Sequence, residues 1–389
     1  MSTANPATSS ESSVRERYSS AAQEREPELC CPVDYDRQYL EIIPQEVIDR
    51  DYGCGDPSKY VRPGETVLDL GSGGGKICFI AAQVVGETGS VIGVDMNDDM
   101  LALARQSQPV VAEKMGYDNI RFCKGKIQDM QVDRDAVDEH LAEHPIRCER
   151  DLQALEAHIN QLRSTAPMIP DNSVDVVVSN CVLNLVDSAE KTKLFAEIFR
   201  VLRPGGRAVI SDIVSDERVP AEMQRDGHLW SGCISGALQE KDFIDGFVEA
   251  GFQGVQMPNY QSEPWQVVGG LEFRSATVIA YKFPEGRCWE HNEAVVYRGP
   301  YACVEDDDGH RFVRGFRTAV CRKTFEKIQS EPYREDFIAI SPATPIKSSN
   351  IEMFPCVGGD SFRDPKVTKG GKVQMNVLDN DCCSTDGCC

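Results

Sequence analysis

The stretch Glu65-Thr-Val-Leu-Asp-Leu-Gly-Ser-Gly-Gly-Gly-Lys76 decides the fold of this chain. Its first six residues form a short apolar run, which predicts a buried strand. Closely spaced glycines follow at once, and the largely apolar residues 76–85 predict a helix. A strand that passes through glycines into a helix exposes backbone N–H groups at the helix N-terminus, where a ligand can approach closely.

The alternation of strand and helix continues toward the C-terminus. Four further strands are expected, over residues 90–95, 120–125, 174–179 and 207–212. Helices are expected from Met100 and from Lys191, and Pro204-Gly-Gly206 is expected to form the turn into the last strand. Strands that alternate with helices pair in parallel through crossover connections. The sequence therefore predicts an α/β fold with a doubly wound, mostly parallel, Rossmann-like sheet.

The chain is expected to consist of four segments. Residues 1–28 contain few large apolar side chains and are expected to form a flexible arm, and residues 29–283 are expected to form the domain that holds the sheet. Residues 284–345 contain β-like runs such as Ala294-Val-Val-Tyr297, which predict a small β-rich C-terminal domain. Residues 346–389 are expected to form a Cys-rich tail.

The connection over residues 131–170 is unusually long for a link between two strands. Apolar residues recur there at intervals of three and four, which predicts a helical insertion with one apolar face. These residues are Leu152, Leu155, Ile159 and Leu162. We expect the helix either to pack on the flank of the domain or to act as a lid over a substrate or partner.

Composition excludes several classes of function. The 389 residues carry 41 Lys+Arg and 62 Asp+Glu, a net charge of −21. Such an acidic surface repels nucleic-acid phosphates and anionic membranes, so neither is expected as a partner. No apolar run approaches the roughly 20 residues that span a bilayer, and the N-terminus lacks the apolar core of a secretory signal. We therefore expect a cytoplasmic protein whose 16 cysteines stay reduced and serve as ligands or redox groups.

Asp95 ends the second predicted strand, 20 residues after Gly75. A carboxylate at this position can accept hydrogen bonds from both hydroxyls of a ribose. The chain departs from the dinucleotide fingerprint, because Lys76 stands where that motif has its third glycine. On these residues alone, a purely structural loop, a nicotinamide site and a site for another ribose-containing ligand all remain open.

The glycine stretch at 67–75 and Leu202-Arg-Pro-Gly-Gly206 resemble two motifs of class I S-adenosylmethionine methyltransferases. The resemblance implies that S-adenosylmethionine is the cofactor. By this resemblance the residues around it are Tyr52 as a cover, Asp69, Gly71 and Gly73 at the methionine part, Asp95 at the ribose, Met96 and Ile127 at the adenine, and Lys76 and Asn180 nearby. For Met96 and Ile127 the alternative is core packing, and for Lys76 it is a solvated helix charge.

Three cysteines are expected at the mouth of this site. Cys54 precedes the first strand, Cys181 directly follows the fourth, and Cys233 lies after the fifth. Open sheets bind ligands at the carboxyl edge of their strands. Three thiols there would form a soft ligand set for a trigonal, trivalent metalloid, whereas zinc takes four ligands or three and a water.

At this point the sequence resembles the arsenite methyltransferase family over most of its length. The matching motifs are Tyr52-Gly-Cys-Gly55, VLDLGSGGG at 67–75, GVDM at 93–96, VVSNCVLNL at 177–185, RVLRPGG at 200–206 and SGCISGAL at 231–238. The resemblance implies transfer of the methyl group of S-adenosylmethionine to thiolate-bound trivalent arsenic, in arsenic detoxification. Lys76-Ile-Cys78 departs from the family's usual Arg-Asp-Cys, and the insertion at 131–170 is longer than the family's connection.

The family uses four cysteines, of which Cys54, Cys181 and Cys233 match three, and either Cys30 or Cys31 is the candidate for the fourth. Methylation formally oxidises arsenic to the pentavalent state, so turnover needs two electrons. We expect Cys54 and one of the adjacent pair to supply them by forming a disulfide, which thioredoxin or glutathione then reduces.

The expected substrate is arsenite or an arsenic–thiol conjugate, and the chain is expected to act as a monomer. Two other classes remain open. A methyltransferase of a small organic acceptor would not need Cys181 and Cys233, and a metalloid-sequestering protein would show no dependence on the cofactor.

Overall fold

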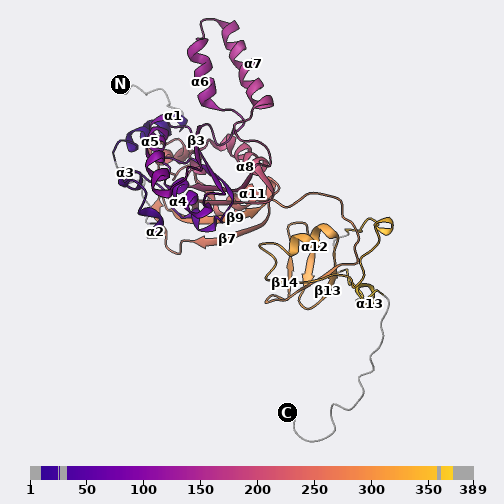
Figure 1. The fold of residues 1–389 in the computed structure, drawn as a ribbon. Helices are drawn as coiled ribbons and strands as arrows, with labels where there is room; N and C mark the ends of the chain where they lie inside the picture. The colour runs from indigo at the N-terminus through magenta and orange to yellow at the C-terminus, as the bar shows by residue number, and fades with distance from the viewer. Residues whose placement is uncertain (1–9, 25, 27–32, 357–360, 371–389) are drawn as a thin grey trace, which may run out of the picture. The chain divides into compact units, whose positions relative to one another are not determined.

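The computed structural model describes residues 10–24, 26, 33–356 and 361–370. The chain forms two compact units, one that ends at Phe283 and one that begins at Pro284. Figure 1 shows the helices and strands of each unit. None of the described helices has the length and apolarity that crossing a membrane requires.

The first unit is built on a mixed, mostly parallel sheet whose main path runs β3-β2-β1-β4-β5-β9-β7. Its strands are β1 Thr66–Leu70, β2 Ser90–Asp95, β3 Ile120–Lys124, β4 Val174–Asn180, β5 Leu202–Ser215, β7 Gln253–Tyr260 and β9 Leu271–Tyr281, with the short strands β6 Leu238–Gln239 and β8 Gln266–Val268 at its margin. Strands β1 to β5 pair in parallel, and β7 and β9 add antiparallel pairings. The predicted doubly wound α/β sheet is therefore confirmed.

Helices cover both faces of this sheet. The main ones are α4 Lys76–Val85, α5 Asp98–Met115, α8 Lys191–Val201 and α11 Glu240–Glu249. Successive residues of a strand point to opposite faces. Val67 accordingly packs in one buried cluster with residues of α4 and α5, and Leu68 packs in another with residues of α8 and α11.

The turn expected before the fifth strand differs from the structure. Strand β5 begins at Leu202, because Leu202 pairs with Val174 and the pairing resumes at Arg207 after a register shift. The expected turn at Pro204-Gly-Gly206 therefore lies inside the strand as an irregularity, with Gly205 at φ 90°.

The expected flexible arm over residues 1–28 also differs from the structure. Residues Ser10–Ala21 form helix α1, which contacts α5 and the short helix α10 Gly227–Ser231. Val14, Ala21 and Ala22 are buried. The weak apolar content of this segment hid a helix that is stabilised by tertiary packing rather than by its own sequence. The remaining short helices of the unit are α2 Arg37–Leu40, α3 Gln45–Asp49, η2 Pro57–Tyr60, η3 Leu183–Leu185, η4 Ser188–Glu190 and α9 Ala221–Gln224.

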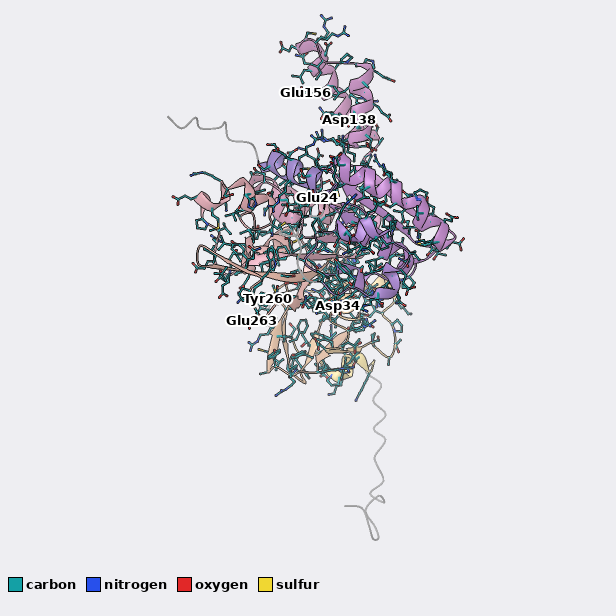
Figure 2. The ribbon with its side chains drawn as sticks, turned by 90° about the vertical axis from the view of Figure 1, so that its left-hand side faces the viewer. Glu24, Asp34, Asp138, Glu156, Tyr260 and Glu263 are labelled. Carbon is teal, nitrogen blue, oxygen red and sulfur yellow. The ribbon has the colours of Figure 1, made fainter. Side chains whose placement is uncertain are left out.

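The insertion forms a helical hairpin of α6 Arg134–Glu143 and α7 Glu149–Thr165. Neither packs broadly on the domain: Val137 is the one buried residue of α6, and α7 has none. Figure 2 shows Asp138 and Glu156 on this hairpin, which projects away from the sheet. The predicted helix is present, but its expected packing on the flank of the domain is wrong.

The second unit holds the three-stranded sheet β13-β10-β14 and the two-stranded sheet β11-β12. Its elements are β10 Ala294–Tyr297, β11 Cys303–Glu305, β12 Arg311–Val313, β13 Arg317–Ala319, α12 Arg322–Ile328, β14 Phe337–Ile340, η5 Ser348–Asn350 and α13 Pro365–Thr368. Met353 and Phe362 form isolated bridges with Trp289 and Thr318. The described part of the expected tail, from residue 346, is thus joined to this unit.

Candidate active site

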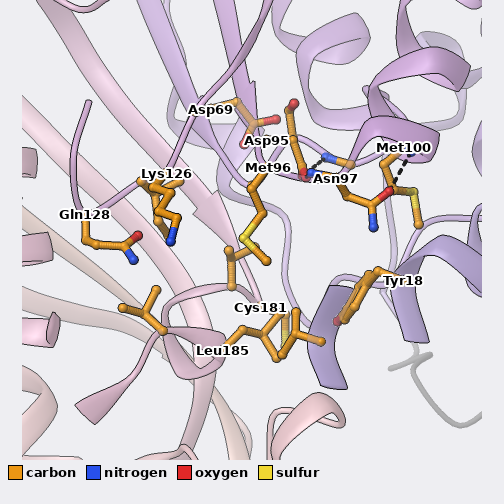
Figure 3. A pocket seen from close by; sticks show the side chains of 18 of the residues that line it. Tyr18, Asp69, Asp95, Met96, Asn97, Met100, Lys126, Gln128, Cys181 and Leu185 are labelled. Carbon is orange, nitrogen blue, oxygen red and sulfur yellow. Dashed lines mark hydrogen bonds between the residues drawn. The ribbon is translucent and has the colours of Figure 1, made fainter. Parts of the chain in front are cut away.

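A cavity of about 660 Å³ lies in the first unit, a size typical of sites for small ligands. The loop between β1 and α4, the end of β2 and the end of β4 contribute to its walls, as expected for the carboxyl edge of a parallel sheet. Figure 3 shows Asp69 and Asp95 on one side of it and Cys181 and Tyr18 on the other, with Met96 between them.

The glycine loop leaves the wall of the cavity bare. Gly71 has φ 67°, and a Cβ there would lie 2.4 Å from Val182, so a side chain is excluded by backbone conformation and by space. Asp95 accepts hydrogen bonds from the N–H groups of Gly73 and Asn97, each 2.8 Å long. Burial raises the pKa of Asp95, although these backbone donors act in the opposite direction. The loop and the acid thus form one preorganised surface.

A second carboxyl group lies at the end of β1. Asp69 is buried and accepts a hydrogen bond of 3.2 Å from the thiol of Cys78. Burial raises its pKa to about 8, against the lowering effect of that hydrogen bond. Cys78, the last residue of the Lys76-Ile-Cys78 stretch that departs from the family's Arg-Asp-Cys, therefore contacts one of the residues expected around the cofactor. A cation in the cavity would favour the ionised form of Asp69.

Most of the residues expected around a cofactor line this cavity: Tyr52, Asp69, Gly71, Gly73, Asp95, Met96, Ile127 and Asn180. Lys76 is not among them. It is buried, its ammonium pairs with Asp51, and it lies 3.6 Å from the centre of the Tyr35 ring. The alternative of a solvated charge is therefore wrong, and the carboxylate that Lys76 contacts belongs to the protein.

The three expected thiols lie together. Cys54, Cys181 and Cys233 are all buried in one cluster, and the sulfur atoms of Cys54 and Cys181 lie within 4.8 Å of each other. Cys181 also lines the cavity. The Cys233 thiol donates to the carbonyl oxygen of Cys181 at 3.2 Å. We call these three residues the edge cluster.

Two members of the edge cluster have an unusual backbone. Cys181 has φ 63° and Cys233 has φ 61°. Both angles lie in the left-handed region, which residues other than glycine and asparagine rarely adopt. The Cys181 N–H donates to the carbonyl oxygen of Ser211 at 2.8 Å, and the Cys233 N–H to that of Trp230 at 3.1 Å. Strained residues held in this way are concentrated at functional sites.

The third thiol is carried by a clamped loop. The Asn180 side-chain oxygen accepts from the N–H groups of Cys54 and Gly55, at 2.8 and 3.0 Å. Ser275 donates to the carbonyl oxygen of Cys54 at 2.6 Å. A Cβ on Gly53 would lie 2.0 Å from Asn180, so glycine is required for the loop to approach β4. Asn180, expected near the cofactor, thus also positions Cys54.

The protonation of the edge cluster follows from burial. Burial raises the pKa of Cys54, against the lowering effect of its hydrogen bond with Cys181. Hydrogen bonds with Cys233 and Cys54, followed by burial, raise the pKa of Cys181 well above its usual value. These two cysteines are therefore thiols rather than thiolates at neutral pH.

Three residues near the edge cluster were missed from the sequence. Asp212 lies with Cys54 and Cys181 such that their ligand atoms are within 4.8 Å of one another, and burial raises its pKa to about 6. Lys191 is buried and donates to the carbonyl oxygen of Gly236 at 2.5 Å, and burial lowers its pKa to about 8. Asp212 had a signal, since it is an acid at the end of a predicted strand.

The third missed residue is Tyr18 of helix α1. Its side chain lines the cavity, hydrogen-bonds with the Cys233 thiol, and packs edge-on against Tyr52 with 6.1 Å between ring centres. The Tyr52 hydroxyl in turn donates to the carbonyl oxygen of Ala21 at 2.9 Å. The N-terminal helix therefore contributes to the site, and nothing in its composition indicated this.

The remaining expected cysteines cannot be placed. Cys30 and Cys31, expected to supply the redox partner of Cys54, lie outside the described residues, as do Cys382, Cys383, Cys388 and Cys389. Of the five cysteines expected in the site, the described residues therefore contain Cys54, Cys181 and Cys233.

Comparison with known proteins gives two family matches. A family described as a methyltransferase domain matches residues 62–165 and 149–251. A family described only as a domain of unknown function matches residues 284–373. The first match covers the glycine loop, Asp95, Cys181 and strands β1 to β6, and the second covers most of the unit that begins at Pro284.

Individual relatives match over more of the chain. The arsenite methyltransferase of Aquipseudomonas alcaligenes is 33% identical, over 77% of this chain and 79% of its own. That of Mus musculus is 30% identical, over 86% and 80%. The crystal structure of an arsenic(III) S-adenosylmethionine methyltransferase from Chlamydomonas reinhardtii is 29% identical, with a TM-score of 0.54, over 81% of this chain and 99% of its own.

Both arsenite methyltransferases are at least 30% identical to this chain, over most of this chain and most of their own length. The chain belongs to the arsenite methyltransferase family.

Proposed function

We propose that this protein transfers the methyl group of S-adenosylmethionine to trivalent arsenic bound by Cys54, Cys181 and Cys233. The observation that carries the proposal is the position of Cys181. Cys181 lines the cavity that the glycine loop and Asp95 also line, and it packs in one buried cluster with the other two cysteines of the edge cluster. A methyl donor and a thiol-bound acceptor would thus face each other across one space.

The residues present fit the cofactor. The bare surface at Gly71 admits a close ligand, and Asp95 offers a carboxylate already aligned by two backbone N–H groups. Asp69 offers a second acid for the cationic part of the molecule. Bound there, S-adenosylmethionine supplies an electrophilic methyl group on a positively charged sulfur.

The edge cluster would bind and orient the acceptor. Arsenite exchanges its three hydroxyl groups for three thiols with release of three waters, so protonated thiols bind it without net proton release. Three As–S bonds leave the arsenic lone pair directed away from the sulfurs. With S-adenosylmethionine held by the glycine loop and Asp95, this lone pair would form the As–C bond as the bond between the methyl group and the cofactor sulfur breaks. The protein contributes chiefly by positioning.

The methyl transfer leaves arsenic formally pentavalent, and two electrons must return it to the trivalent state. We propose that Cys54 and either Cys30 or Cys31 supply them by forming a disulfide. Thioredoxin or glutathione then reduces that disulfide. Serine at both Cys30 and Cys31 should stop turnover of arsenite with thioredoxin as reductant, and unchanged turnover would contradict this part of the proposal.

We place catalysis in the expected domain of residues 29–283 together with helix α1, whose Tyr18 lines the cavity. The test is incubation of the purified protein with S-adenosylmethionine, glutathione and arsenite, with methylarsenicals measured by chromatography and mass detection. Cys181→Ser is the test variant, and Cys123→Ser, a buried cysteine on β3, is the control.

We expect methylarsenicals from the parent and from Cys123→Ser, but not from Cys181→Ser. Methylarsenicals from all three proteins would remove the edge cluster from the mechanism. No product from any of them, with S-adenosylmethionine still bound, would favour a small organic acceptor instead.

A further inference from the structure

A second group of three thiols lies in the unit that begins at Pro284, in the region matched by a family described as a domain of unknown function. The sulfur atoms of Cys288, Cys321 and Cys356 lie within 4.8 Å of one another, and all three residues are free cysteines. We call these residues the C-terminal cluster. It has no part in the proposed methyl transfer, because none of the three lines the cofactor cavity.

The three thiols come from segments that backbone hydrogen bonds join. Cys288 accepts a hydrogen bond of 2.8 Å at its carbonyl oxygen from the N–H of Phe354, which holds the segment of Cys356 beside it. The next residue, Trp289, forms a bridge with Met353 and accepts 2.9 Å from the N–H of Arg322. The convergence of the thiols is therefore fixed by the backbone rather than by the side chains alone.

The thiol of the central cysteine is held in place by its neighbours. Cys321 is buried, and its sulfur accepts from the N–H of Thr324 at 3.5 Å and lies 3.3 Å from that residue's hydroxyl. These contacts fix the position of the sulfur that the other two thiols approach.

The number of ligands selects the ion. Among the residues that the structure describes, no His, Asp or Glu shares the 4.8 Å distance with all three thiols. Zinc prefers four protein ligands in a structural site, whereas trivalent arsenic is complete with three sulfurs. A disulfide would use only two of the cysteines and leave the third without a role.

We propose that Cys288, Cys321 and Cys356 bind one trivalent arsenic as a second trithiolate site. The choice of arsenic as the ion rests on the proposed function, while the convergence of three thiols does not. Three As–S bonds replace three As–OH bonds, three waters leave, and no atom is oxidised or reduced. Because the site joins three separate segments, occupancy stabilises this unit by ligand binding to its folded state.

The test counts arsenic per chain in the full-length protein, with serine at the six terminal cysteines that would also bind it: Cys30, Cys31, Cys382, Cys383, Cys388 and Cys389. Sodium arsenite is added after removal of reductant, and bound arsenic is measured after equilibrium dialysis by mass spectrometry. We expect two arsenic atoms per chain in this background. X-ray absorption should show three sulfur neighbours for each.

Further variants separate the two sites. We expect one arsenic atom with Cys356→Ser, one with Cys181→Ser, none tightly bound with both, and two with the control Cys303→Ser, an exposed lone cysteine in the same unit. Cys356 is exposed, so its replacement is least disturbing to the fold, and circular dichroism checks folding. A count that falls with Cys181→Ser but not with Cys356→Ser overturns this inference alone.

The reverse result, a count that falls only with Cys356→Ser, would overturn the proposed function and leave the C-terminal cluster as a binding site. Zinc provides the remaining outcome. One equivalent of zinc in the purified protein that Cys356→Ser removes, and that arsenite does not displace, would show a zinc centre and overturn the assignment of arsenic.

Discussion

The edge cluster and the C-terminal cluster each bring three cysteines together, but the two clusters differ in burial and in backbone conformation. All residues of the edge cluster are buried, two of them have left-handed backbone, and Cys181 faces a cavity of about 660 Å³. In the C-terminal cluster exposure rises from the buried Cys321 to the exposed Cys356, and no member has positive φ. The difference teaches that three thiols specify a soft ion, whereas the surroundings decide whether that ion can react.

The largest effect should come from removing the thiol that joins the edge cluster to the cavity. We expect Cys181→Ser to lower the rate of arsenite methylation by about 10³-fold or more, because the acceptor loses its position relative to the donor. Product formation at saturating S-adenosylmethionine measures this, and Cys303→Ser should keep the parental rate. An equal loss with Cys321→Ser would contradict the division between a reacting and a holding cluster.

The next effect concerns Asp212, whose carboxylate lies beside Cys54 and Cys181 of the edge cluster. Asp212 accepts from the N–H groups of Leu183 and Ile213 and from the side-chain amide of Asn184, each at 2.8 Å. Asp212→Asn sets an amide against these donors, so we expect about 2 kcal/mol of lost stability in urea unfolding. Asp242→Asn, at an exposed ion pair with Arg218, should cost well under 1 kcal/mol. Equal losses would remove the special role of Asp212.

The affinity of the cavity for S-adenosylmethionine should depend on pH, which would distinguish this cavity from a site that only binds a metal ion. The pKa of Asp69 is raised to about 8, so below pH 8 the free protein holds it protonated, and a bound cation favours its ionised form. Affinity for S-adenosylmethionine should therefore rise by about tenfold from pH 6 to pH 8 and level off above. Calorimetry would detect the proton released on binding. Asp69→Asn should flatten the profile, and an unchanged slope would assign it to Asp95, whose pKa is also raised.

The smallest effect should come from the N-terminal helix that covers the edge cluster. Tyr18→Phe removes the hydroxyl that contacts Cys233 but keeps the ring against Tyr52. Because one hydrogen bond contributes about 1 kcal/mol, we expect a rise of about fivefold in KM for arsenite with kcat nearly unchanged. Steady-state kinetics in arsenite measures both. A fall in kcat with constant KM would place Tyr18 at the reacting atoms instead.

Much of the sheet could be predicted, because its strands are short apolar runs between glycines and helices. The positions of Cys54, Cys181 and Cys233 at one edge followed from the same pattern. Tyr18 could not be predicted, since its helix has little apolar content and depends on packing against α5 and α10. The contact of Lys76 with Asp51 was equally hidden, because a pattern of residue types does not reveal which acid a lysine will reach.

The convergence of the C-terminal cluster could not be predicted from the sequence either. Cys288, Cys321 and Cys356 are 33 and 35 residues apart, with no short motif between them. Their convergence depends on the Trp289–Met353 bridge and the turn into α12, which are products of tertiary folding. Scattered cysteines of this kind become a site only once the chain is folded.

The left-handed backbone of Cys181 and Cys233 has a consequence for how the site persists in evolution. A residue with a Cβ in this conformation costs roughly 1–2 kcal/mol, and glycine avoids most of that cost. Glycine at either position would therefore relieve strain and remove the thiol. Under the proposed function, arsenic binding is what would keep cysteine at both positions against this gain in stability.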